Sequence, residues 1–312
     1  MSLVSASSPI QTLHRRGFSR RQLYETLFLV CGFMATLIGI LMMLALVASL
    51  AHDGMARITP DFFTNFPSRH AERAGILAAW VGSLLVIMVT ALTAIPVGVA
   101  AAVYLEEYAN RNWLTEIIEI NVANLAGVPS IIYGLLALGL FVYQFGLGNS
   151  ILTAGLTLAL LILPIIIVAT REAIRSIPSS LRDAAYAMGA TKWRMIADHL
   201  IPYSSPGILT GVIIGLSRAI GETAPLITIG ALTFIAFLPP APVQTEFPFV
   251  SFSWLGSPFT VMPIQMFNWV SRPDPAFQQN AAAAGLVLLL MTLAMNGFAI
   301  ALRYRLRKSL VW

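Results

Sequence analysis

Charged residues are scarce in this sequence. Asp, Glu, Lys and Arg make up 11% of its 312 residues, whereas soluble domains contain roughly 25%. Too few charges remain to coat a globular surface, and the hydrophobic residues, 57% of the chain, fall into long runs. Lipid must therefore surround much of the chain, and an organisation as two soluble domains is excluded.

Cysteine and lysine are scarcer still. Cys31 is the only cysteine and lies within the first hydrophobic run, so an internal disulfide and a cysteine metal cluster are both excluded. The only lysines are Lys192 and Lys308, which follow Thr191 and Arg307, whereas the lysine of a P-loop follows a glycine. The chain thus lacks a Walker A site, and any ATP hydrolysis must belong to another subunit.

Metal ligands and a nucleic-acid surface are not evident either. The four histidines, at positions 14, 52, 70 and 199, do not form a ligand cluster. We expect no metal site, no cofactor and no catalytic residue. Lys and Arg outnumber Asp and Glu by 19 to 14, but most of them lie beside hydrophobic runs, as the positive-inside rule expects. Nucleic acid is therefore not an expected partner, whereas the lipid bilayer is.

Long uncharged runs predict an all-α polytopic membrane protein with six transmembrane helices. The expected spans are residues 27–50, 74–105, 120–145, 151–170, 206–237 and 281–302. The first run has 24 residues, whereas the core of a signal peptide has about 7–15, so we interpret it as an uncleaved span. Residues 120–170 carry no charge. As one helix they would be roughly 77 Å long, so they must cross twice, reversing at residues 146–150.

The distribution of Lys and Arg predicts the orientation of the spans. With both termini in the cytoplasm, the inner segments hold 14 of these residues and the outer loops hold four, which favours that orientation. The expected domains are a cytoplasmic tail at 1–26, a membrane domain at 27–305 and a second tail at 306–312. A cytoplasmic loop is expected at 172–203 and a periplasmic loop at 238–278. The aromatic residues of the periplasmic loop suggest either an interfacial belt or a docking surface for an external partner.

The cytoplasmic loop is predicted to form two short helices joined by a bend. Ser180 and Asp183 match a capping box at the start of the first helix. Gly189 fits the left-handed position that ends this helix, and Thr191 can cap the second one. The apolar face of the first helix is expected to consist of Leu181, Ala184, Ala185 and Met188. Small residues at the bend would let another protein approach closely, and a plain amphipathic connector is the alternative.

The same loop carries a recognisable pattern. Asp183-Ala184-Ala185, followed by Gly189 and then Pro202, resembles the EAA loop of bacterial ABC importer permeases, which docks into the ATPase subunit. Asp183 stands where glutamate is usual, a change that keeps the shape of the motif. The resemblance implies that Asp183, Ala184, Ala185 and Gly189 couple this chain to an ATPase.

The fifth expected span is unusual because it contains charges. On an ideal helix, Arg218 and Glu222 share one arc of about 80° with a stripe of three glycines, at positions 207, 211 and 215. One interpretation is a helix-packing seam with a neutral structural ion pair. The other is that Arg218 faces an aqueous path and offers its planar guanidinium to an oxyanion, with Glu222 holding it in place. Both roles are common for charges within a membrane.

Two further segments resemble one family. Residues 217–226 (SRAIGETAPL) and 127–134 (GVPSIIYG) are similar to segments of the phosphate-specific (Pst) permeases, and more to the A-type than to the C-type subunit. The likeness extends from about residue 74 to the C-terminus. It implies a type I ABC importer permease fold and a place in the bacterial inner membrane. It also implies inward movement of inorganic phosphate along a path that we expect to include Arg218, Glu222, Thr223, Ser130 and Arg171.

The resemblance also implies partners. These are a second permease subunit (PstC-like), two copies of an ATPase subunit (PstB-like) and a periplasmic phosphate-binding protein (PstS-like). The alternatives are a permease for another oxyanion, such as phosphonate or sulfate, an ion-driven secondary transporter, and a membrane-embedded enzyme. Pro129 and Pro225 are expected to break spans three and five near the same depth, either lining a cavity or forming simple kinks.

Overall fold

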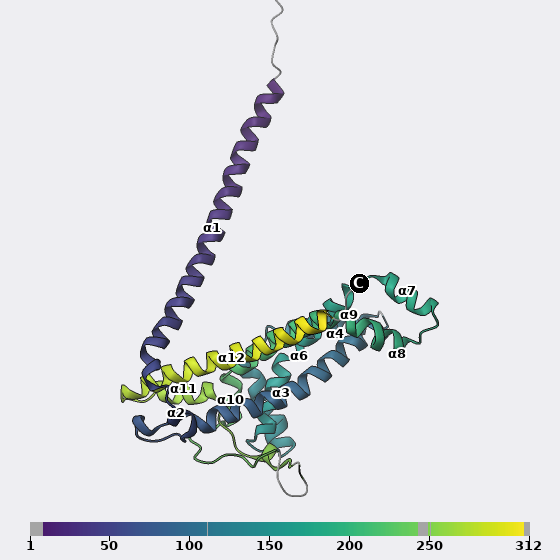
Figure 1. The fold of residues 1–312 in the computed structure, drawn as a ribbon. Coiled ribbons are helices and arrows are strands. Elements are labelled where there is room, and N and C mark those ends of the chain that lie inside the picture. Colours follow the sequence, from purple (N-terminus) through teal and green to yellow (C-terminus); the bar gives the residue numbers. More distant parts are fainter. Residues whose placement is uncertain (1–8, 111, 243–248, 250, 309–312) are drawn as a thin grey trace, which may run out of the picture. The chain divides into compact units, whose positions relative to one another are not determined.

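A computed structural model of the chain describes residues 9–110, 112–242, 249 and 251–308. Their regular structure is entirely helical (Figure 1). The chain divides into two compact units, residues 1–52 and residues 53–312. The first unit is almost wholly the long helix α1 (Pro9–Gly54), which contains the expected first span. Because α1 begins at Pro9, the expected N-terminal tail is helical from that residue onward, and residues 1–8 lie outside the described part.

The second unit is a bundle built around α6 (Ile151–Arg175). Helix α6 packs against α3 (Leu77–Val103) and α9 (Ile201–Gly221), and α9 in turn packs against α12 (Ala276–Lys308). The buried side chains at the centre include Leu158, Leu161 and Ile162. These four helices are each long and apolar enough to span a membrane, in line with the expected second, fourth, fifth and sixth spans. Of the expected C-terminal tail, residues 306–308 continue α12, and residues 309–312 lie outside the described part.

Glycines on α9 let it approach α6 closely. A methyl group added at Gly207 or Gly211 would collide with Ala173 or Ala169 on α6, because the two backbones are nearly in contact there. Small residues that bring backbones together in this way are typical of helix packing in membranes. The glycine stripe is therefore a packing seam, as one of the two interpretations expected.

The expected third span is broken beside Pro129, as the sequence predicted. Helix α4 (Trp113–Leu125) and helix α5 (Ser130–Ala137), which continues as a π-helix η4 (Leu138–Gln144), meet at an angle of 109°. Pro129 lacks the N–H that would continue the helix and restricts the residue before it. The Tyr133 hydroxyl donates to the carbonyl of Leu125 at 2.8 Å and braces the bend. The described residues thus hold five candidate spans, or six when the bent pair counts as one.

The fifth span was expected at residues 206–237, but its second half does not continue the helix. Helix α9 ends at Gly221, Glu222 has an extended backbone, and the short helix α10 (Ala224–Thr228) follows in place of a continuing span. The cause is local, because Pro225 cannot donate the hydrogen bond that a continuing helix would need and also restricts the residue before it. Glu222 therefore does not lie on the helix face where an ideal helix would place it.

Short elements close the end of the bundle from which α12 starts. They are η1 (Met55–Arg57), α2 (Pro60–Thr64), η2 (Ala71–Arg73), η6 (Ser253–Gly256) and α11 (Met262–Val270). Helix α11 packs on α12, and Trp269 is fully buried beside Phe62. Among the aromatic residues of the 238–278 segment, Trp254 is also buried, whereas Phe252 and Phe267 are exposed. Phe247 lies outside the described residues.

The other end of the bundle, which we call the coupling end, carries α7 (Ser179–Ala187), α8 (Lys192–Arg194) and the π-helix η5 (Met195–Leu200) (Figure 1). The two short helices and their bend are as expected: Gly189 has a φ of 83°, and the Thr191 hydroxyl accepts from the Arg194 N–H. The expected capping box is wrong. Helix α7 begins at Ser179 directly after Pro178, and its N-cap makes no side-chain hydrogen bond among the described residues.

Candidate functional site

Arg218 and Glu222 form an ion pair where α9 ends. The Arg218 Nε lies 3.2 Å from the Glu222 Oε1, and the side chains are 35% and 18% exposed. The pair was expected from the sequence spacing, although Glu222 reaches Arg218 from just beyond the helix rather than from its next turn. Because the contact uses Nε, the two terminal nitrogens of the guanidinium lie outside it. This partly accessible arginine is the only charged residue of α9.

The two helix breaks come together beside this pair. Helix α10 packs on α5, where Gly134 lies directly against Pro225 and Thr228. Ser130 begins α5 one turn before Gly134, and Thr223 lies two residues before Pro225. Both Ser130 and Thr223 are half-buried. The structure thus places Arg218, Glu222 and Thr223 on one turn of the chain and Ser130 on the adjoining helix.

Arg171 lies elsewhere, in a cluster of charges at the coupling end. Its buried guanidinium lies 2.6 Å from a Glu119 carboxylate oxygen and 3.4 Å from one of Glu106. Arg175 joins them, at 2.9 Å from Glu106 and 3.9 Å from Glu119. Arg175 also lies 3.8 Å from Glu172 on its own helix. The contacts with Glu106 and Glu119 tie α6 to the end of α3 and to α4.

The packing of α6 on α9 separates this cluster from Arg218. Contacts of Ala173 and Ala169 with α9 set Arg171 level with residue 209, and at 1.5 Å per residue Arg218 lies about 13 Å further along the helix. The structure therefore does not bring Arg171 together with the Arg218 pair. Its part in a substrate path stays a prediction.

Sequence reasoning missed several polar residues. Glu106 and Glu119 each flank a long uncharged run, which was the signal that they stand at the ends of membrane helices. Asn296 on α12 contacts the Ser217 hydroxyl at 2.6 Å and links α9 to α12 beside Arg218. An isolated asparagine in a membrane helix commonly makes such an interhelical contact.

The residues expected to couple to an ATPase divide into an outer and an inner set. Asp183, Ala184 and Gly189 are exposed, whereas Ala185 is 2% exposed and packs inward. Met188, which was expected on the same apolar face as Ala184 and Ala185, is 77% exposed. The large apolar side chains of Tyr186 and Trp193 are exposed as well. The coupling end therefore presents an apolar surface of the kind that a protein partner covers.

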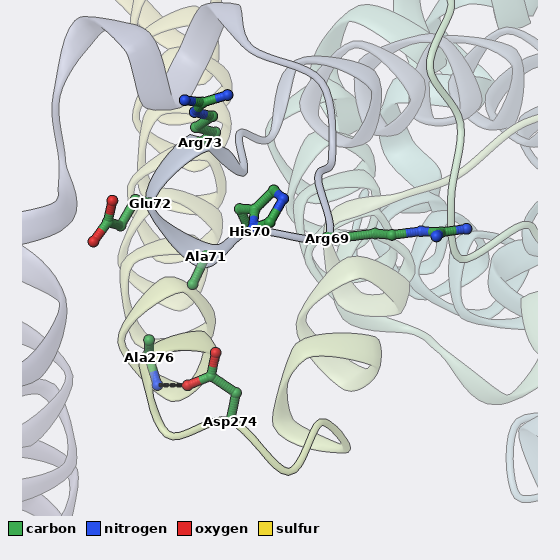
Figure 2. Close-up of a pocket in the computed structure, with 7 residues that line it drawn as sticks. All are labelled: Arg69, His70, Ala71, Glu72, Arg73, Asp274 and Ala276. Carbon is green, nitrogen blue, oxygen red and sulfur yellow. Dashed lines mark hydrogen bonds between the residues drawn. The ribbon is translucent and has the colours of Figure 1, made fainter.

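A pocket with mixed charge lies at the end where α12 begins (Figure 2). It has a volume of about 430 Å³ and is lined by Arg69, His70, Ala71, Glu72, Arg73, Asp274 and Ala276. The Asp274 carboxylate accepts from the Ala276 N–H at 2.9 Å and so caps the start of α12. The lining of this pocket includes none of the expected site residues.

The chain belongs to the family described as the binding-protein-dependent transport system inner membrane component, which matches residues 94–310. It is 30% identical over 276 residues to the phosphate transport system permease protein PstA of Yersinia pestis, covering 86% of each chain. It is 28% identical over 313 residues to the protein of the same name in Mycobacterium leprae (strain TN), covering 97% of each.

Solved structures share the fold. The chain resembles a chain of a bacterial alginate ABC transporter, with a TM-score of 0.62 and 16% identity, covering 89% of this chain and 94% of that one. It also resembles a chain of the inward-facing MetNI methionine ABC transporter, with a TM-score of 0.53 and 17% identity, covering 72% and 91%. The predicted fold class, an all-α polytopic protein with the type I ABC importer permease fold, is confirmed.

Proposed function

We propose that this chain is the permease subunit of an ATP-driven importer of inorganic phosphate and forms half of the path across the bacterial inner membrane. The observation that carries the proposal is the Arg218–Glu222 pair, a partly accessible charge pair beside two helix breaks in an apolar bundle. Relatives that cover nearly the whole chain are named for phosphate transport, and this supports phosphate over phosphonate or sulfate.

The chemistry of the pair suits a passing oxyanion. An arginine in mid-membrane costs at least ~2.5–3.5 kcal/mol on insertion scales, and a carboxylate partner offsets part of this cost. Phosphate would compete with Glu222 for the guanidinium, whose terminal nitrogens offer the bidentate geometry that phosphate oxygens accept. Ser130 and Thr223 would add hydroxyl donors at the adjoining breaks, where backbone groups freed from the helices are tolerated along a cavity.

A second permease subunit is proposed to cover α4. This helix has no buried residue in the chain alone, and it exposes Ile117 and Ile118 together with the amides Asn121 and Asn124. The Asn121 amide donates one N–H to the Ile117 carbonyl at 2.8 Å. Lipid would cover the isoleucines but could not bond the amide groups left over, which makes their exposure to hydrocarbon costly. A protein partner that shares an aqueous path with α4 satisfies both kinds of side chain.

The chain is a transport subunit, and we place ATP hydrolysis on two copies of a separate ATPase, one of which docks on the exposed face of α7 and α8. Ala184, Gly189 and the exposed Met188 would lie in that contact. A periplasmic binding protein would deliver phosphate at the end where α12 begins. This arrangement puts both termini in the cytoplasm, as the distribution of Lys and Arg favours.

Uptake of labelled phosphate by vesicles that contain the assembled complex tests the proposal. We expect uptake that requires ATP and the binding protein. Excess unlabelled phosphate should suppress this uptake, whereas phosphonate or sulfate at the same concentration should not. Uptake driven by an ion gradient without ATP would identify a secondary transporter instead. Stronger competition by sulfate or phosphonate would reassign the substrate within the oxyanions.

A further inference from the structure

The end of α3 widens into a π-helical turn, η3 (Tyr104–Tyr108), and three consecutive residues of this turn contact three different elements of the coupling end. Glu106 pairs with the arginines of α6. Glu107 pairs with Arg182 of α7. The Tyr108 ring lies under the Lys192 ammonium of α8, at 4.6 Å from the ring centroid. Such π-turns are frequent at functional sites, and this one lies where all three elements meet.

Arg182 is the most extensively bonded residue of this junction. Its Nε and Nη2 donate to the same Glu107 oxygen at 3.0 and 2.9 Å. It also donates to the carbonyls of Ile177 and Ile174, at 3.0 and 3.3 Å, near the end of α6. The Arg182 side chain is 21% exposed and that of Glu107 is 9% exposed. One guanidinium therefore fastens α7 to α3 and α6 together, by directional, charge-assisted bonds that a lysine could not reproduce in full.

Apolar packing also holds α7 against α3 and α6. Ala185 of α7 packs in a small core with Val103 of α3, Ile174 of α6 and three residues of η5. The opposite side of α7, with Ala184 and Met188, is exposed. Helix α7 is thus fastened on its inner side to two membrane helices and open on its outer side to a partner. It therefore stands between a partner on one side and the two membrane helices on the other.

We infer that the Glu107–Arg182 pair is a positioning pair that passes movement of α7 to α3 and α6. The inference rests on the proposed function, because it requires an ATPase that moves α7. Helices α3 and α6 pack together along their length, so a displacement delivered to η3 reaches both. The Glu106 contacts with Arg171 and Arg175 hold η3 against α6 while this happens. Without the ion pair, α7 would still be folded and exposed, but its movement would no longer be imposed on α3.

The test uses the assembled complex with Glu107→Ala, Glu107→Gln and Arg182→Lys. Three quantities are measured: copurification of the ATPase, the rate of ATP hydrolysis, and labelled phosphate taken up per ATP hydrolysed. We expect Glu107→Ala to retain the ATPase and its hydrolysis while uptake per ATP falls at least tenfold. In Glu107→Gln, uptake per ATP should fall less, because the amide oxygen still accepts from Arg182. In Arg182→Lys, uptake per ATP should lie between the values for Glu107→Ala and the unaltered complex.

Glu172→Ala is the matched control. Glu172 is an exposed carboxylate on α6 that lies 3.8 Å from Arg175 and has no ion pair with α7 among the described residues. Its removal should leave uptake per ATP unchanged. Unaltered uptake per ATP in Glu107→Ala overturns the inference, and so does loss of the ATPase from that complex, which would make the pair a purely structural one. If the unaltered complex shows no ATP-dependent phosphate uptake, it is the proposed function that fails.

Discussion

Removing both charges of the Arg218–Glu222 pair is expected to stop phosphate transport without dismantling the complex. At 3.2 Å and an effective dielectric constant of about 20, the attraction within the pair is ~5 kcal/mol, and the cost of desolvating the two groups offsets most of it. The single change Arg218→Gln would strand Glu222 at a cost of ~1–3 kcal/mol. A single variant that fails to transport therefore cannot separate a structural role from a substrate contact.

The double change Arg218→Gln with Glu222→Gln strands no charge and keeps similar volumes, so assembly should be nearly normal. If Arg218 binds the anion, two charge-assisted hydrogen bonds worth ~1.5–3 kcal/mol each are lost. At 1.4 kcal/mol per tenfold, uptake should fall by about 100-fold or more. Arg218→Lys should retain part of the uptake at most, because an ammonium keeps the charge but loses the planar fork.

The chain supplies a matched control for the double variant. Arg21 and Glu25 on α1 are the same residue types at the same spacing, with the Nε 3.1 Å from the carboxylate oxygen, but both are well exposed. Replacing both with glutamine should leave uptake intact. The assay is labelled phosphate uptake together with ATPase activity stimulated by the loaded binding protein. Near-normal uptake by the Arg218→Gln, Glu222→Gln complex would refute the substrate contact and leave the pair as helix packing.

Those parts of the fold that depend on a single segment could be predicted from the sequence. Uncharged runs located the membrane helices because hydrocarbon tolerates few charges over 20 residues. Gly189 and Thr191 marked the end of α7 and the start of α8 because their roles depend only on local backbone geometry. The ion pair of Arg218 with Glu222 followed from their spacing. These are short-range effects that a single sequence displays.

At two prolines the local signal was visible but its full consequence was not. Pro129 and Pro225 were recognised as helix breakers, yet each was fitted into a continuing span because apolar residues follow it. A proline fixes where a helix stops but not the direction in which the chain continues. That direction depends on α5 packing against α10, through the close contact of Gly134 with Pro225.

The charge cluster at the coupling end lay beyond sequence reasoning for a different reason. Arg171 and Glu106 are 65 residues apart, and Arg182 and Glu107 are 75 apart. The positive-inside rule explains a basic residue at a helix end equally well without a partner. Only the packing of α6 against α3 decides which carboxylate each arginine meets. The ion pairs that hold α7 and α6 to α3 could therefore be identified only in the folded chain.

Three further perturbations test the topology, the coupling surface and the packing seam. In a background without the native cysteine, a cysteine at Ala241 should react with an impermeant thiol reagent from outside, whereas one at Ser176 should react only after permeabilisation; the reverse pattern would invert the topology. Ala184→Trp should abolish copurification of the ATPase without affecting insertion. It is a cleaner probe than a change at Gly189, where the φ of 83° would strain any side chain. Gly211→Val should drive a side chain into α6 at a cost of ~1–3 kcal/mol, so the purified permease should unfold at a lower temperature. Unchanged thermal stability would mean that α9 and α6 do not meet at this seam.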